Sequence, residues 1–301
     1  MPLQLQNSFQ VTASFRKQLA VLAELTKLRI TFFVSITTLF GFVSAKGYFT
    51  VDALFSCLGI FLMACSSAVL NQIQEHEIDS VMERTKSRPI PSGQVSVKSA
   101  VLLVIELFFL AVLVFSLTNW TTFWIGVVTF IWYNLIYTPL KKKHYLAIIP
   151  GSVIGALPPM AGWAAAGRSI LEPQILLIAF FFFVWQIPHF WLLLLQYRKD
   201  YESAGFPTMF KRFTREQLSR ITFAGIVFTG FIGVSFPIFA FVHAWYLIAI
   251  ILFAFIYMVV QSLSLLDKSL KVKSFKPVFI GVNLYVLFVI VIISIDRFIL
   301  P

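Results

Sequence analysis

Charge is scarce in this sequence. Only 12% of the 301 residues are charged, and acids are rarer than bases, with 13 Asp and Glu against 24 Lys and Arg. Soluble domains carry about 25% charged residues. Together with a hydrophobic fraction of 59% and a mean hydropathy of +0.87, this shortage excludes an ordinary soluble globular protein and predicts a membrane protein.

Cysteine is nearly absent as well. Cys57 and Cys65 lie in one apolar segment, and on a helix they would be ~12 Å apart along the axis, too far for a disulfide. Their spacing also matches no metal site. Residues 1–27 contain no short apolar core with a small-residue cleavage site, and the bias of an organelle transit peptide is weak, so we expect no removable signal.

Long apolar runs are abundant. Nine runs have about 20 residues, enough for a helix to cross a ~30 Å hydrocarbon layer. We place these spans at residues 28–46, 52–72, 98–117, 120–138, 145–166, 173–196, 218–238, 244–266 and 276–295. The sequence therefore predicts an all-α polytopic membrane protein. A segment over 1–27 precedes a single nine-helix domain over 28–301.

The distribution of bases predicts the orientation. All but Lys46, Arg168 and Arg297 of the 24 Lys and Arg residues lie in or beside the N-terminal segment and the loops after the second, fourth, sixth and eighth spans. Positively charged loops stay on the cytoplasmic side. We therefore expect a cytoplasmic N-terminus and a C-terminus outside. The net charge of +11 then reflects topology and attraction to anionic lipids rather than nucleic-acid binding.

The few acids are concentrated in two segments, 73–97 and 197–217, which this orientation places in cytoplasmic loops. If the second span continues as a helix past the membrane edge, Asn71, Glu75 and Asp79 project from nearly the same face. Two carboxylates one turn apart repel each other unless a cation lies between them. Amide and carboxylate oxygens suit Mg²⁺, so we predict a magnesium site at these three residues.

Two arginines follow this face. Arg84 and Arg88 are one helical turn apart and are followed by Pro89 and Pro91, which would end a helix. Their planar guanidinium groups are suited to binding phosphate oxygens. The stretch therefore predicts a polyanion site at the lipid boundary. The alternative is a solvated charged loop, an interpretation that we keep for the residues off the common face: His76, Glu77, Glu83 and Lys86.

These residues resemble the first signature of the UbiA-type intramembrane prenyltransferases. The matching positions are Asn71, Glu75, Asp79, Met82, Arg84, Thr85, Arg88 and Pro89. Further blocks resemble the branch of that family that farnesylates haem: 137-YTPLKKK-143, 151-GSVIGALPPMAGWAAAG-167, and 185-WQIPHFW-191 with 200-DYESAGFP-207. The resemblance covers almost the whole chain.

The resemblance implies nine helices around a central, lipid-open cavity with Mg²⁺ and a prenyl diphosphate at its cytoplasmic mouth. The implied catalytic residues are Asn71, Asp79, Arg84 and Arg88, and the implied metal ligands are Asn71, Glu75 and Asp79 with Asp200 and Glu202 from the second acidic segment. Glu75 stands where family members often have Asp. Lys199 precedes a lone Asp200, so the choice between Asp200 and Glu202 for a second metal stays open.

Polar residues inside or at the end of two other spans are candidates for substrate binding, together with Arg88. Gln186 and His189 lie in the sixth span, where polar side chains are costly unless they face a cavity. Asn134, Tyr137 and Lys141 lie at the inner end of the fourth span, within reach of a diphosphate or haem propionates. The alternatives are a structural histidine and a lysine cluster that only anchors the topology.

The resemblance further implies the reaction. A farnesyl group passes from farnesyl diphosphate to the vinyl group of haem b, giving haem O, with Mg²⁺ as cofactor and membrane lipids as surroundings. Haem A synthase is a candidate partner, and we expect the cell's inner (plasma) membrane rather than the mitochondrial inner membrane. The competing hypotheses are a quinone-pathway aromatic prenyltransferase and a secondary transporter, which would place charges at the membrane midplane.

Overall fold

The protein is an all-α bundle, as the sequence predicts. The computed structural model describes residues 16–267 and 274–299, and all regular structure within those ranges is helical. Nine helices in this part of the chain are long and apolar enough to cross a membrane. Most of the N-terminal segment and three bases used for the orientation, Lys268, Lys271 and Lys273, lie outside the described residues.

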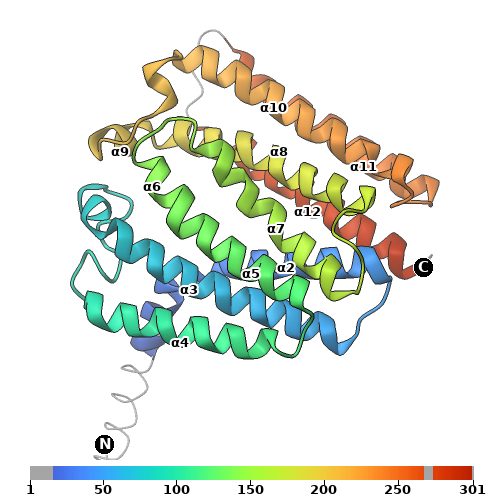
Figure 1. Ribbon diagram of the computed structural model, residues 1–301. Coiled ribbons are helices and arrows are strands. Elements are labelled where there is room, and N and C mark those ends of the chain that lie inside the picture. The colour runs from blue at the N-terminus through green and yellow to red at the C-terminus, as the bar shows by residue number, and fades with distance from the viewer. Residues whose placement is uncertain (1–15, 268–273, 300–301) are drawn as a thin grey trace, which may run out of the picture.

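The spans pack side by side, and the longest connections follow α3 and α8 (Figure 1). The long elements are α2 (Leu28–Lys46), α3 (Val51–Val81), α4 (Val97–Phe115), α5 (Trp120–Ile131), α7 (Ile148–Ala165), α8 (Pro173–Gln196), α10 (Arg215–Ser235), α11 (Trp245–Ser262) and α12 (Lys276–Ile299). The short helices α6 (Thr138–Lys141) and α9 (Arg198–Ser203) lie at one end of the bundle.

One boundary differs from the expected one in a way that matters for function. Helix α3 ends at Val81 rather than at 72, so the first part of the expected acidic loop 73–97 is helical. The residues over 73–81 include the helix formers Gln and Glu and neither glycine nor proline. The backbone becomes extended only at Met82.

The fourth span also ends in an unusual way. Helix α5 continues through a π-helical turn, Trp132–Tyr137, into α6, which carries Pro139 in its first turn. Proline has no backbone N–H to donate to the preceding turn, and π-helical turns often occur at functional sites. Tyr137 and Lys141 are thereby carried on one continuous span.

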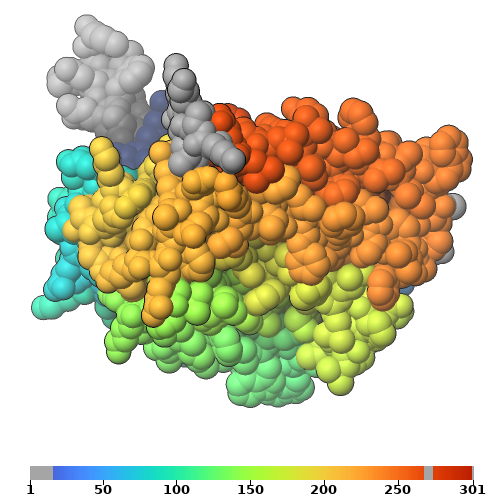
Figure 2. Space-filling model, turned by 90° about the horizontal axis from the view of Figure 1, so that it is seen from above, coloured from blue at the N-terminus to red at the C-terminus, as the bar shows by residue number. Residues whose placement is uncertain are grey.

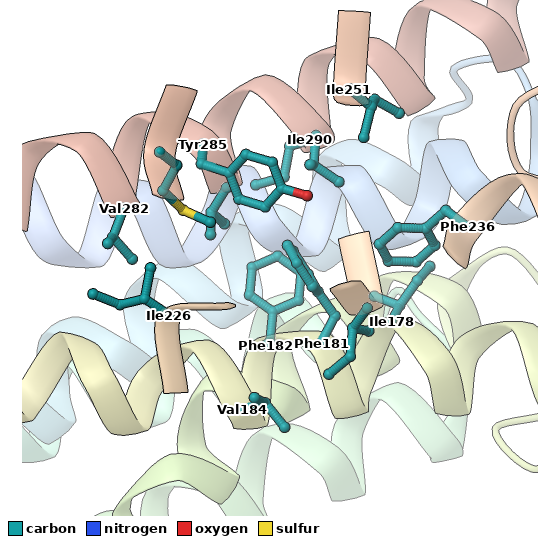
Figure 3. Close-up of a cluster of buried hydrophobic side chains, with 14 of the residues drawn as sticks. Ile178, Phe181, Phe182, Val184, Ile226, Phe236, Ile251, Val282, Tyr285 and Ile290 are labelled. Atoms are coloured by element: carbon teal, nitrogen blue, oxygen red, sulfur yellow. The ribbon is translucent and has the colours of Figure 1, made fainter. Parts of the chain in front are cut away.

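The core has two main parts. The larger lies among α8, α10, α11 and α12, where Phe181 packs against Phe236 and the same cluster includes Phe182, Ile226 and Val282 (Figure 3). The smaller lies among α3, α4, α5 and α7. Because lipid provides no hydrophobic drive for helix association, such interlocking packing holds the spans together.

Glycines let α7 approach its neighbours closely. A Cβ on Gly162 would lie 1.8 Å from the carbonyl oxygen of Thr38 on α2. Farther along the helix, a Cβ on Gly151 would lie 2.5 Å from the ring of Tyr137, and one on Gly155 would lie 2.5 Å from the Gln186 amide. The small-residue pattern of this helix therefore provides close packing and room for two polar neighbours.

The two acidic segments lie at the same end of the bundle. The chain that follows α3 and the short helices α6 and α9 gather at the left of Figure 1, whereas α12 ends at the right. Seen from above, the segment after α3 and the segment around α9 lie next to each other at the left edge (Figure 2). The fold thus brings both acidic segments to one end of the molecule.

Candidate active site

A cavity of about 810 Å³ opens at the charged end of the bundle. Its polar lining comes from the residues before α2, the end of α3 and the end of the fourth span. Its apolar and aromatic lining includes Tyr133, Phe190, Trp191, Leu194 and Phe206. The size lies within the range of small-molecule sites, ~300–1,000 Å³.

The end of α3 contributes the oxygen donors. Asn71, Glu75 and Asp79 follow one another at four-residue intervals, all line the cavity, and all are at least 95% buried. The helix extension described above is what aligns them, since residues four apart lie on one helical face. An amide and two carboxylates therefore project into the same buried space.

A different base holds each of these donors. The Lys27 ammonium donates to Oδ1 of Asn71 at 2.8 Å, Lys141 pairs with Oε1 of Glu75 at 2.5 Å, and Arg88 donates to Oδ2 of Asp79 at 2.6 Å. Such charge-assisted contacts satisfy buried carboxylates that would otherwise be costly.

The loop after α3 fixes the arginines. The Thr85 hydroxyl donates to the carbonyl oxygen of Asp79 at 3.0 Å, which folds the chain back over the helix end. Arg84 lines the cavity and lies over the ring of Tyr197, 5.4 Å from its centroid. Arg84 and Arg88 thus both face the cavity, whereas Glu83 and Lys86 pair with each other at the exposed surface.

Lys27 is half-buried in an electropositive environment. Burial lowers the pKa of its ammonium group to about 7, and the positive charges of Arg88 and Lys141 act in the same direction against Glu75 and Asp79. An anion bound beside Lys27 would favour its charged form and raise this pKa again.

The donor set fits a divalent cation that also binds phosphate. Within residues 16–267 and 274–299, no group of three or more His, Cys, Asp and Glu side chains could hold a metal ion by itself. Mg²⁺ is usually held by one or two carboxylates together with waters and substrate phosphates. Glu75, Asp79 and the Asn71 amide match that requirement.

The other predicted substrate-binding residues are divided between the cavity and its surroundings. Tyr137 and Lys141 line the cavity. Asn134 is fully buried, and its amide donates to Ser67 at 2.6 Å, outside the cavity lining.

The polar pair on α8 also lies outside the lining. Gln186 rests against Gly155 of α7. Nδ1 of His189 lies 2.9 Å from Oδ1 of Asn283 on α12, and the Asn283 amide donates to the Phe279 carbonyl, so His189 is the donor in this contact. His189 therefore connects α8 with α12.

The acids of the second segment face elsewhere. Asp200 lines a separate cavity of about 330 Å³ together with Arg198, Lys199 and Arg215. Glu202 pairs with Arg198 at 2.7 Å on the surface. Other residues of this segment line the cavity of about 810 Å³, which we call the main cavity: Tyr201, Phe206, Pro207, Thr208 and Met209.

Two kinds of residue that line the cavity could not be identified from the sequence. Lys27 precedes the first span directly, where a lysine is typical of a topology anchor, and its spacing from Asn71 along the chain carries no signal of contact. The aromatic residues Tyr133, Trp191 and Tyr201 are not distinctive in a chain with 17% aromatics.

Comparisons with known proteins agree with this architecture. Residues 34–285 match the UbiA prenyltransferase family. The chain is 30% identical to a protohaem IX farnesyltransferase of Bdellovibrio bacteriovorus over 287 residues, which is 93% of this chain and 97% of the relative. It is 34% identical to a protohaem IX farnesyltransferase of Oleidesulfovibrio alaskensis, covering 62% of this chain and 66% of that relative.

Solved structures show the same fold. A digeranylgeranylglyceryl phosphate synthase superposes with a TM-score of 0.74 at 17% identity, covering 94% of this chain and 100% of the other. A UbiA homologue from Archaeoglobus fulgidus bound to GPP and Mg²⁺ superposes with a TM-score of 0.59 at 16% identity, covering 91% of this chain and 99% of the other. The family match over residues 34–285 and the sequence similarity along nearly the whole chain show that the chain belongs to the UbiA family of membrane prenyltransferases.

Proposed function

We propose that this protein transfers a farnesyl group from farnesyl diphosphate to a vinyl group of haem b and so makes haem O. The observation that carries the proposal is the similarity along nearly the whole chain to a protohaem IX farnesyltransferase, at 30% identity. The cavity supports it, because charged residues at its mouth adjoin an aromatic and aliphatic wall. A prenyl diphosphate has the same division between a polar head and an apolar tail.

The bases at the mouth bind the diphosphate in this proposal. Arg84, Arg88 and Lys141 all line the cavity and can neutralise the charge that grows on the leaving diphosphate as its bond to the farnesyl carbon breaks. Mg²⁺ held by Asn71, Glu75 and Asp79 would supply further stabilisation of that charge. This is the catalytic role that we assign to Asn71, Asp79, Arg84 and Arg88.

The apolar wall protects the reactive carbon. Tyr133, Phe190, Trp191 and Phe206 line the cavity beside its charged residues, and in this proposal they keep water away from the farnesyl carbon. The vinyl carbon of haem b then forms the new bond to the farnesyl carbon. One water molecule supplies the hydroxyl group of the hydroxyethylfarnesyl side chain, and a proton is released together with diphosphate.

The acceptor is assigned to the side of the cavity formed by α8 and the fourth span. Tyr137 lines the cavity, and its ring lies 6.5 Å from that of Phe190. Asn134, Gln186 and His189 lie outside the lining, against Ser67, Gly155 and Asn283, so in this proposal they support the helix packing beside the acceptor rather than contact haem directly. We keep Asp200 as a candidate second-metal ligand and Glu202 as the weaker candidate, since Glu202 already pairs with Arg198 on the surface.

The membrane location follows from the same proposal. The chain is an integral membrane protein, and we assign it to the inner (plasma) membrane with the cavity mouth on the cytoplasmic side, where its bases are concentrated. A haem A synthase would consume the product and is the partner that we propose.

A single reaction tests the function. Purified protein in detergent is given haem b, Mg²⁺ and farnesyl diphosphate, and the products are analysed by mass spectrometry. We expect the mass of haem O in the complete mixture, and neither without Mg²⁺ nor without farnesyl diphosphate. A parallel reaction with an aromatic quinone precursor tests the rival: prenylation of that acceptor with no haem O would overturn the proposal.

A further inference from the structure

Basic side chains occupy the oxygen donors of the expected metal site. The three bases come from separate parts of the chain: Lys27 precedes α2, Arg88 follows α3, and Lys141 ends α6. Each contacts a different donor on α3, at 2.8 Å, 2.6 Å and 2.5 Å respectively. Each carboxylate is contacted through one of its two oxygens, so a divalent cation must compete with the three bases for the donors on α3.

The charge balance of the cavity opposes a cation that arrives alone. The lining contains more bases than acids: Lys27, Arg29, Arg84, Arg88 and Lys141 against Glu24, Glu75 and Asp79. A divalent cation would add positive charge to this excess beside the buried Glu75 and Asp79, where electrostatic interactions are stronger than in bulk water. A diphosphate would instead neutralise the excess and give the bases a new partner.

The backbone at and before Lys27 has a fixed, unusual conformation. It adopts the left-handed conformation, with φ 49°, which is uncommon for residues other than glycine. The Gln72 amide donates to the carbonyl oxygens of Glu24 and Leu25, both at 2.9 Å, and so fixes the turn that precedes Lys27. Strained backbone positions persist where the surroundings determine them and are concentrated at functional sites.

We propose that Lys27 binds the diphosphate of the substrate, and that diphosphate must enter before Asn71, Glu75 and Asp79 can hold a divalent cation. The diphosphate takes over Lys27, Arg88 and Lys141 as counterions, and the oxygen donors on α3 are released for the metal. Metal and diphosphate then bind with positive cooperativity. This inference rests on the proposed function, because it assumes a diphosphate substrate.

Equilibrium dialysis tests the binding order with two simple probes, Mn²⁺ and labelled inorganic pyrophosphate. The protein is kept in one detergent, and retention is measured with each probe alone and with both together; the pyrophosphate sample contains EDTA. We expect pyrophosphate to be retained without metal, Mn²⁺ alone not to be retained, and both to be retained together. Retention of one Mn²⁺ per chain without pyrophosphate, or no pyrophosphate in EDTA, would overturn the proposal.

Two substitutions test the role of Lys27 itself. Lys27→Met removes the charge, and Lys27→Gln also removes it but keeps an amide that can donate to Asn71. We expect both to weaken pyrophosphate binding in EDTA about tenfold, the factor for losing one charge-assisted contact, and Lys27→Arg to restore most of it. The matched control is Lys143→Met, an exposed lysine outside the cavity, which should bind like the parent. Parent-like binding by Lys27→Gln would contradict the assignment.

Failure of this inference and failure of the proposed function are distinguishable. If Mn²⁺ binds alone but haem O is formed, the function stands and the binding order is wrong. If pyrophosphate binds first and Lys27→Gln weakens it, but no haem O is formed, the diphosphate site stands and the acceptor is wrong.

Discussion

The two acidic segments look alike in sequence but contribute different things to the cavity. The first begins within α3 and supplies Glu75 and Asp79, which are buried and face inward together with Asn71 one turn earlier. The second, around α9, directs Asp200 to a separate cavity and pairs Glu202 with Arg198. The second segment contributes aromatic residues to the lining of the main cavity, among them Tyr201 and Phe206.

The difference arises from helix length. Helix α3 has 31 residues and keeps one face aligned from the membrane into the cavity mouth. Helix α9 has only six residues, none of them buried, so no extended face can form. Charge density in the sequence is therefore a weaker guide to a site than charges repeated on the face of a long helix.

The largest expected effect comes from the first segment. Asp79→Asn removes the carboxylate that holds Arg88 and is assigned to the metal, so we expect haem O formation to fall about a hundredfold or more, as when an electrostatic contact of the transition state is lost. Turnover is measured at saturating Mg²⁺ by mass spectrometry. Glu83→Gln is the control, because Glu83 belongs to the same segment but its side chain is 78% exposed. An equal loss of turnover in Asp79→Asn and Glu83→Gln would contradict the assignment of the metal to the inward face of α3.

A substitution in the aromatic wall of the cavity should lower the rate less than Asp79→Asn does. It should also change the specificity for the length of the isoprenoid. Trp191→Ala removes an indole from the lining, and we expect the kcat/KM for farnesyl diphosphate to fall about tenfold while the relative use of geranylgeranyl diphosphate rises. A competition assay with both diphosphates measures the ratio. The control is Trp124→Ala on α5, because Trp124 is a residue with 56% exposure that lies outside the cavity lining. An unchanged ratio in Trp191→Ala would place the isoprenoid elsewhere.

The acid that lines the separate cavity should matter less than Asp79. Asp200→Asn is expected to lower turnover by less than about tenfold, because Asp200 does not line the main cavity. The measurement is the Mg²⁺ dependence of turnover, compared directly with that of Asp79→Asn. A loss as large as that of Asp79→Asn would show that both segments hold metal and that the cavity rearranges around its ligands.

The smallest effect is expected at the surface pair. Glu202→Gln breaks an ion pair in which both side chains are more than 40% exposed, so the free energy of unfolding should change by less than ~1 kcal/mol. Turnover should stay within about twofold of the parent, as for Glu216→Gln, which breaks a similar pair with Arg220 on α10. Loss of turnover in Glu202→Gln alone would make Glu202 the better candidate for the second metal.

Much of the fold could be predicted because each span carries its own signal. Nine apolar runs became nine spans within the described part of the chain, and the prediction that Asn71, Glu75 and Asp79 share a helical face is confirmed by the length of α3. Periodicity is a local property, so local sequence is sufficient to detect it.

Contacts between distant segments could not be predicted in this way. The interpretation of Lys27 as a topology anchor missed its contact with Asn71, and Gln186 and His189 gave no sign of resting on Gly155 and Asn283. These contacts depend on how α2, α7, α8 and α12 pack. Polar residues within spans indicate only that a polar partner exists.

The sequence by itself determined the membrane class, the nine spans and the inward face of α3, because hydropathy and helical periodicity act over neighbouring residues. Only the tertiary structure decided which bases meet that face and that Asp200 lies outside the main cavity. The physical reason is that a charge pair depends on distance in space. Packing alone brings Lys27, Arg88 and Lys141 from three separate parts of the chain to one buried helix.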